Sequence, residues 1–80
     1  MIRLEVTYYA LLRDMRGLSS ERMETEAHTP AELYRALCEE HDLRLPAKAV
    51  KVSVNHEFQT WDTPLKDGDE VGFLPPVSGG

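Results

Sequence analysis

Cysteine, tryptophan and long uncharged runs are all scarce in this chain of 80 residues. Its one cysteine excludes a disulfide within the chain and fits a reducing compartment. No uncharged run approaches the roughly 20 residues that a membrane-spanning helix needs. Arg3 and Glu5 interrupt any apolar segment near the start. We therefore expect a cytoplasmic protein without a signal peptide and without a membrane partner.

Basic residues are outnumbered and scattered along the chain. Nine Lys and Arg stand against 14 Asp and Glu, which gives a net charge of −5 at pH 7. Nucleic acid would be repelled by such a surface, so we expect no nucleic-acid partner. The three histidines lie far apart and, with a single cysteine, give no metal-ligand spacing, so we expect no metal site.

Hydrophobic periodicity predicts one small α+β domain. Strands are expected at 2–9, 20–27, 50–54, 58–60 and 70–74, and a short helix at 10–16. A long helix begins at the capping box Thr29-Pro30-Ala31-Glu32 and is closed off by Leu45-Pro46. Its apolar face is expected to consist of Leu33, Tyr34, Ala36, Leu37 and Cys38. This pattern predicts one sheet with the long helix packed across one of its faces.

Three apolar side chains are predicted to point away from the core. In the last strand Val71 and Phe73 share the inward parity, so Leu74 falls on the outward one. Tyr9 has the outward parity of its own strand, and Phe58 belongs to a short peripheral strand. If the three come together, they form an apolar patch suited to docking a partner.

The end of the sequence is chemically unusual. Two prolines, Pro75 and Pro76, stiffen the exit from the last strand, and Gly79 and Gly80 leave the terminal carboxylate without neighbouring side chains. Such an end can enter a narrow site in another protein. A cloning remnant or an idle flexible end would also finish in glycine, so Gly-Gly by itself leaves both interpretations open.

Other candidate chemistry has a simpler structural explanation. Cys38 lies on the apolar flank of the long helix and is expected to act as a small hydrophobic residue. The segment Asp67-Gly68-Asp69 lacks the spaced ligands of a calcium loop and predicts a tight turn. Trp61 is expected to pack under a loop. The terminal carboxylate is therefore the distinctive reactive group.

The segment from Pro64 to Gly80 resembles the end of the small subunit of molybdopterin synthase, a family of sulfur carriers. Its specific parts are Asp-Gly-Asp-Glu-Val and Pro-Pro-Val-Ser-Gly-Gly. The segments 8–14 and 52–55 are also similar to the first strand and helix and to the third strand of that family. The resemblance spans essentially the whole domain. It implies a ubiquitin-like β-grasp fold for residues 1–74, followed by a flexible tail at 75–80.

The resemblance also implies a chemistry for the tail. In this family an activating enzyme that resembles ubiquitin E1 uses ATP and magnesium to adenylate the terminal glycine, which here is Gly80. Sulfur transfer then gives a thiocarboxylate, and the sulfur passes to cyclic pyranopterin monophosphate to form molybdopterin. Gly79 and Ser78 would be inserted into the large subunit with Gly80. The carrier itself would bind no cofactor, and the catalytic acids and bases would belong to its partners.

The resemblance further implies partners and a surface for them. The family's synthase is a heterotetramer of two small and two large subunits, and the activating enzyme is an E1-like adenylyltransferase. Its partner-facing positions match Leu74, Phe58, Tyr9, Arg13 and Val77 in this sequence. Three alternatives stay open: a sulfur carrier for thiamine or tRNA thiolation, a ubiquitin-like protein modifier, and a domain whose Gly-Gly end has no function.

Overall fold

The computed structural model describes residues 1–76. Its elements in chain order are β1 (Ile2–Tyr8), α1 (Ala10–Arg16), β2 (Ser20–Thr25), α2 (Pro30–His41), the 3-10 helix η1 (Ala47–Ala49), β3 (Lys51–Val54), β4 (Glu57–Gln59) and β5 (Glu70–Leu74). Residues 77–80, which include most of the predicted tail, lie outside the described residues.

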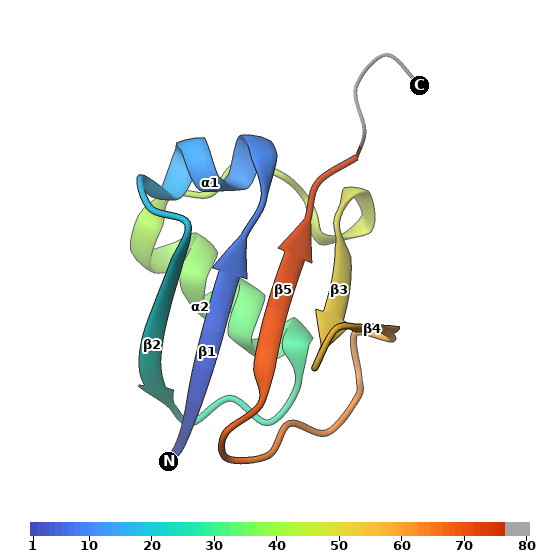
Figure 1. The fold of residues 1–80 in the computed structure, drawn as a ribbon. Helices are drawn as coiled ribbons and strands as arrows, with labels where there is room; N and C mark the ends of the chain where they lie inside the picture. Colours follow the sequence, from blue (N-terminus) through green and yellow to red (C-terminus); the bar gives the residue numbers. More distant parts are fainter. Residues whose placement is uncertain (77–80) are drawn as a thin grey trace.

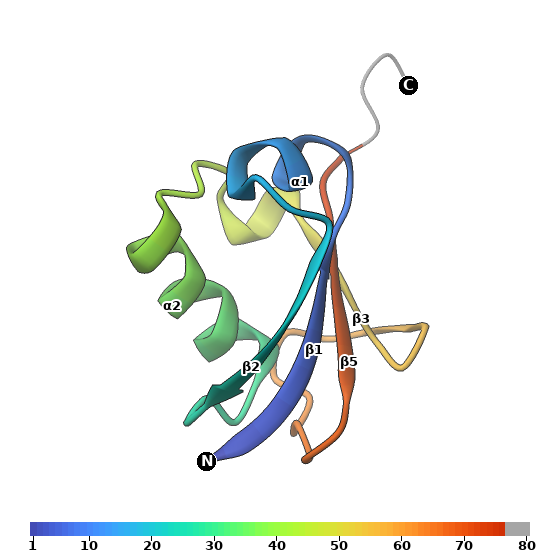
Figure 2. The same ribbon diagram turned by 60° about the vertical axis from the view of Figure 1, so that its left-hand side comes forward.

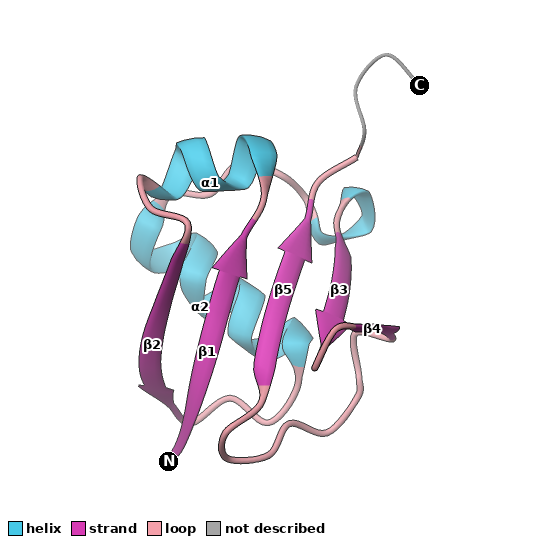
Figure 3. Ribbon diagram, in the orientation of Figure 1, coloured by secondary structure: helices cyan, strands magenta, loops and turns pink. Residues whose placement is uncertain are grey.

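The strands form one mixed five-stranded sheet in the order β2-β1-β5-β3-β4. β1 and β5 run parallel in the middle, and the other neighbouring strands are antiparallel. Figure 1 and Figure 3 show α2 crossing behind this sheet. Turning the molecule shows α1 and α2 on the same side (Figure 2), so the opposite side is an open face. The predicted single sheet of five strands with one long helix across it is confirmed.

The parallel pairing of β1 with β5 decides what lies at the end of the last strand. Parallel strands end at the same edge of a sheet, so α1, which follows β1, lies beside the point where β5 ends (Figure 1). Tyr8 pairs with Phe73 in this register, which leaves Tyr9 next to Leu74. The fold therefore brings the beginning of α1 to the strand that leads into the Gly-Gly segment.

The predicted capping box forms at the start of α2. The Thr29 hydroxyl accepts a hydrogen bond from the Glu32 amide at 3.3 Å, and the Glu32 carboxylate accepts one from the His28 amide at 2.8 Å. α2 ends at His41, earlier than Leu45-Pro46, because Asp42 takes a left-handed backbone with φ 54°. The residue after a helix often adopts this conformation, which closes the last turn.

The core lies between the sheet and the two helices. Leu4, Val6 and Tyr8 from β1 and Val71 and Phe73 from β5 are buried, as their alternation predicts. From α2, Leu33, Tyr34 and Leu37 are buried, whereas Ala36 is exposed; its assignment to the apolar face was wrong. The buried stripe of α2 is therefore narrower than the apolar face that the sequence suggests.

Three aromatic rings fill one end of the core. Tyr34 lies 5.4 Å from Trp61 and 5.1 Å from Phe73 between ring centroids, and Trp61 stacks on Phe73 at 6.0 Å. The Tyr34 hydroxyl donates to the Leu45 carbonyl at 2.6 Å. Trp61 thus packs under its loop as predicted. Within residues 1–76, no helix is both long enough and apolar enough to span a membrane.

Candidate functional site

A small hollow on the open face gathers the three apolar residues that the strand parity singled out. It has a volume of about 160 Å³ and is lined by Tyr9, Ser53, His56, Phe58 and Leu74. Phe58 is 68% exposed and Tyr9 41% exposed, while Leu74 is half-buried. The prediction that Tyr9, Phe58 and Leu74 come together is confirmed. Leu74 is less exposed than expected because its neighbours on the open face partly cover it. We call this feature the open-face hollow.

Strand register explains why these residues meet. Gly72 of β5 lies opposite Thr7 on one side and Ser53 on the other, and Ser53 in turn lies opposite Phe58. Side chains that are opposite one another across a sheet point to the same face. The row through Gly72 and Ser53 therefore runs beneath the open-face hollow and links the middle of the sheet to β4.

Gly72 lies next to Tyr9, Ser53 and Leu74, three of the residues that line the hollow, and it has no side chain. A Cβ at this position would lie 2.6 Å from the Ser53 hydroxyl oxygen, 3.2 Å from the Tyr9 ring and 3.9 Å from Leu74. The ring of Tyr9 can therefore lie close over the β5 backbone. Any side chain at position 72 would push against the wall that Tyr9 provides.

The junction between β1 and α1 sends adjacent tyrosines to opposite sides of the sheet. Tyr8 is buried in the core, while the Tyr9 amide donates to the Phe73 carbonyl at 3.3 Å. Ala10 then takes a left-handed backbone with φ 50°, and the Leu12 amide donates to the Tyr9 carbonyl at 3.1 Å. This sharp turn places Tyr9 on the open face while Leu12 enters the core.

The tip of the β3–β4 hairpin forms the rim of the hollow. Asn55 and His56 both have positive φ, 53° and 70°, which is the backbone of a type I′ turn. The His56 Nε2 atom lies 2.8 Å from the Oε2 atom of Glu70, the first residue of β5. Asparagine suits the first position of this turn, whereas histidine is less favourable at the second. The turn keeps Phe58 of β4 beside the end of β5.

A hydrogen-bonded cluster behind the hollow ties α1 to β1 and β2. The Glu21 carboxylate accepts two hydrogen bonds from Arg16, both at 2.9 Å, and one from the Tyr8 hydroxyl at 2.6 Å. Burial by itself would raise the pKa of the Glu21 carboxyl, but hydrogen bonds from Arg16 and Tyr8 outweigh it and lower that pKa. Burial, reinforced by Glu21, raises the pKa of Tyr8. The cluster therefore holds Tyr8 in place, and with it the neighbouring Tyr9.

The predicted turn at Asp67-Gly68-Asp69 is confirmed, and its carboxylates accept hydrogen bonds from the protein itself. Asp67 accepts one from the Arg3 amide at 2.8 Å. Asp69 accepts one from the Lys66 amide at 2.8 Å and one from the Asn55 side chain at 3.0 Å. Gly68 has φ 90°, which favours glycine. The motif therefore fixes the start of β5 and its distance from the hairpin.

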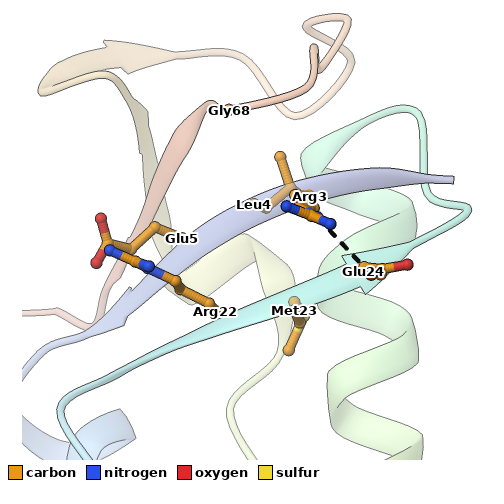
Figure 4. Close-up of a pocket in the computed structure, with 7 residues that line it drawn as sticks. All are labelled: Arg3, Leu4, Glu5, Arg22, Met23, Glu24 and Gly68. Atoms are coloured by element: carbon orange, nitrogen blue, oxygen red, sulfur yellow. Dashed lines mark ion pairs between the residues drawn. The ribbon is translucent and has the colours of Figure 1, made fainter.

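A larger hollow of about 640 Å³ lies at the other end of β1, by the turn at Gly68 (Figure 4). Its charges are balanced across the two strands: the Arg3 Nε atom lies 3.8 Å from the Glu24 Oε1 atom, and Glu5 is the register partner of Arg22. Such a ladder of opposite charges is expected of a solvated sheet surface. We assign no ligand to it, and it shares no residue with the open-face hollow.

The other predicted site residues, Arg13 and residues 77–80, are not among the described residues that line the open-face hollow. Arg13 lies on α1, exposed, with its Nε atom 3.9 Å from Asp14, and it does not line the open-face hollow. Val77, Ser78, Gly79 and Gly80 lie outside the described residues, so their roles stay predictions. Sequence reasoning missed the Glu21 cluster and Ser53. The parity of β3 could have indicated Ser53, since it alternates with the buried Val52 and Val54.

Comparison with known proteins identifies the family. The profile of the ThiS family matches residues 6–80. This chain belongs to the ThiS family. The molybdopterin synthase sulfur carrier subunit of Escherichia coli is 31% identical to this chain, and the alignment covers 96% of this chain and 99% of the relative. That of Chlamydomonas reinhardtii is 32% identical, covering 99% and 100%. The resemblance seen in the sequence is confirmed.

Solved structures of similar fold agree with the ThiS-family assignment. SAMP1 from Haloferax volcanii is 26% identical, with a TM-score of 0.78 over 98% of this chain and 99% of that one. In a complex of subunits 1 and 2 of the molybdopterin-converting factor from Helicobacter pylori, the matching chain is 28% identical, with a TM-score of 0.69 over 99% and 100%. A Caldiarchaeum subterraneum ubiquitin, 14% identical with a TM-score of 0.63 over 99% and 98%, shows the fold alone. The ubiquitin-like β-grasp prediction is confirmed.

Proposed function

We propose that this chain is the sulfur carrier subunit of a molybdopterin synthase. The observation that carries the proposal is its similarity, along nearly the whole length of both chains, to molybdopterin synthase sulfur carrier subunits. The Gly-Gly end supplies the group that such a carrier needs. The open-face hollow, formed in part by the last residue of β5, supplies a surface for partners close to that end.

The proposed chemistry takes place on the carboxylate of Gly80. This carboxylate attacks the α-phosphate of ATP and releases pyrophosphate, which gives a glycyl adenylate. Sulfur at the oxidation level of hydrosulfide attacks the acyl carbon and displaces AMP, so a C–S bond replaces the C–O bond to AMP and the product is a thiocarboxylate. Activation is needed because a bare carboxylate is a poor acyl donor, and the adenylate divides one difficult step into two easier ones. ATP and magnesium are bound by the activating partner, and no cofactor is assigned to this chain.

The proposed recipient of the sulfur is cyclic pyranopterin monophosphate, held by the large synthase subunit. The slender Ser78-Gly79-Gly80 segment would enter that subunit's active site, with Val77 close behind. The complex of the two Helicobacter pylori subunits supports a large-subunit partner. An E1-like adenylyltransferase is the second proposed partner, and the reducing cytoplasm is the proposed compartment. Tyr9, Phe58 and Leu74 would contact both partners, with Arg13 at the margin.

Intact-protein mass spectrometry tests the carrier function. The chain is incubated with an E1-like activating enzyme, ATP, magnesium and a sulfur donor. We expect the exchange of one oxygen for one sulfur, located at Gly80 by fragmentation, and no exchange without ATP. Unchanged mass under conditions that convert a known carrier would contradict the proposal.

A ubiquitin-like modifier is a second candidate, favoured by the structural similarity to SAMP1, a small archaeal modifier protein. It predicts conjugates in which Gly80 is joined to lysine side chains of other proteins. Affinity-tagged chain isolated from its host separates the candidates. Conjugates that disappear when Gly80 is deleted would support the modifier, whereas only free or thiocarboxylated chain fits the sulfur carrier.

A further inference from the structure

Lys51 stands beside the open-face hollow without belonging to its apolar lining. It is the first residue of β3 and lies directly opposite Leu74 in the register with β5. Its Nζ atom lies 5.8 Å from the centre of the Phe58 ring, within the range of a cation–π contact. Two residues of the proposed docking surface, Leu74 and Phe58, are thus direct neighbours of one exposed cation.

The charge of Lys51 is not neutralised within the described chain. Five arginines have a carboxylate oxygen within 4.0 Å: Arg3, Arg13, Arg16, Arg35 and Arg44. Among residues 1–76, no carboxylate oxygen lies that close to the Lys51 ammonium. Arg22, Lys48 and Lys66 also lack such a partner among the described residues, so it is the position of Lys51, opposite Leu74 and 5.8 Å from the centre of the Phe58 ring, that is particular to it.

Covering the hollow changes the solvation of Lys51. A partner that packs on the exposed Phe58 ring must also remove water from the ammonium next to it. Removing water from an ammonium without supplying an acceptor is unfavourable, because the charge loses its hydration and gains no partner. A partner with an apolar surface alone would therefore bind poorly. A carboxylate placed to meet Lys51 would offset this cost and would also steer the encounter.

We propose that Lys51 pairs with an acidic side chain of the large synthase subunit. On that subunit, the acidic side chain lies next to the apolar group that fills the open-face hollow. This inference rests on the proposed function, since it names a chemical property of the partner in that complex. Lys51 is a recognition residue here. It does not touch the reacting atoms, and its effect is on association and not on the sulfur transfer step.

Three variants test the pairing, with binding to the purified large subunit measured at several salt concentrations. Lys51→Glu reverses the charge, and Lys51→Met keeps the apolar stem in a neutral residue of similar length. Lys66→Glu makes the same charge change in the loop before β5, at the other end of that strand. Trp61 fluorescence and thermal unfolding establish that each variant is folded.

We expect Lys51→Glu to bind at least about tenfold more weakly and Lys51→Met about three- to tenfold more weakly, with a shallower salt dependence. Lys66→Glu should bind within about twofold of the parent chain. Binding by Lys51→Met that is as tight as that of the parent chain, or tighter, would overturn the inference. A loss in Lys66→Glu equal to that in Lys51→Glu would also overturn it, because it would show that binding depends only on the net charge of the chain. If the parent chain accepts sulfur but does not bind the large subunit, the proposed function itself fails and the inference falls with it.

Discussion

Replacing Glu21 with glutamine keeps the shape of the side chain and removes its charge, so it isolates what the carboxylate does for Arg16 and Tyr8. The carboxylate accepts three hydrogen bonds between 2.6 and 2.9 Å. The Arg16 and Glu21 side chains are only 18% and 19% exposed, so solvent screens the pair less than at an open surface. Hydrogen bonds to charged groups contribute about 1.5–3 kcal/mol each, but glutamine retains some of them. We expect Glu21→Gln to lower the free energy of unfolding by about 2 kcal/mol at pH 7.

The pH dependence of this loss follows from the direction of the pKa shift. The folded protein holds the pKa of Glu21 below that of an unfolded glutamate, about 4.3. The stability that the carboxylate contributes is therefore fully present above the unfolded pKa and is lost as the pH falls through the folded one. Glutamine does not titrate, so the difference between the parent chain and Glu21→Gln should shrink as the pH falls from 7 towards 3.

Urea unfolding followed by the fluorescence of Trp61, the chain's single tryptophan, measures both effects. Glu24→Gln is the matched control, because its Arg3 partner is 3.8 Å away and both side chains are largely exposed. This control should lose less than about 0.5 kcal/mol at any pH. If Glu21→Gln loses no more stability than the control, or if its loss stays constant between pH 7 and pH 3, the Glu21 carboxylate does not stabilise the fold in this way.

Three further predictions concern the hollow, the hairpin and the tail. Leu74→Glu should weaken binding to the large subunit by at least about tenfold in a titration, because it places a charge in an apolar contact. Ala36→Glu, on the far side of the sheet, is the control. Undiminished binding by Leu74→Glu, or an equal loss in the control, would show that Leu74 does not contact the large subunit. His56→Val should lower the free energy of unfolding measured in urea by about 1–2 kcal/mol, because φ is 70° at this position and a β-branched residue disfavours it. Glycine tolerates this φ, so His56→Gly should not lower the free energy of unfolding. Equal stabilities of the two variants would be inconsistent with the type I′ turn. Deleting Gly80 should abolish sulfur transfer. The melting temperature should stay within about 2 °C of the parent chain, since the buried core of the described chain ends at Phe73. A large fall in melting temperature would mean that the tail supports the fold.

Local sequence patterns predicted most of the helices and strands, because the spacing of apolar residues within each element reflects which of its faces is buried. The alternation from Ile2 to Tyr8 and the capping box at Thr29 lie within a few residues of the features that they predict. The order of the strands depends on contacts between distant segments, and no local pattern encodes the parallel pairing of β1 with β5. Ala36 shows the same limit: helical spacing places it near the apolar stripe, but it is exposed in the folded chain, and burial depends on what α2 packs against.

The candidate site was predictable where parity alone decides the face of a strand. Tyr9 and Leu74 were assigned to the outward face in this way, and the structure places both in the open-face hollow. Parity places Lys51 on the outward face together with Ser53, but its position opposite Leu74 depends on the register between β3 and β5, which no local pattern encodes. The Glu21 cluster was also beyond reach, since it joins residues from three elements that meet only in the folded chain.

Reconstitution from purified components shows whether Gly80 delivers sulfur to a pterin precursor. Thiocarboxylated chain is mixed with the large synthase subunit and cyclic pyranopterin monophosphate, and molybdopterin is quantified together with the mass of the carrier. We expect molybdopterin to form while the carrier returns to a carboxylate, with two carriers consumed for each product because its dithiolene holds two sulfurs. A thiocarboxylate that stays intact beside a competent large subunit, with no molybdopterin formed, would contradict it.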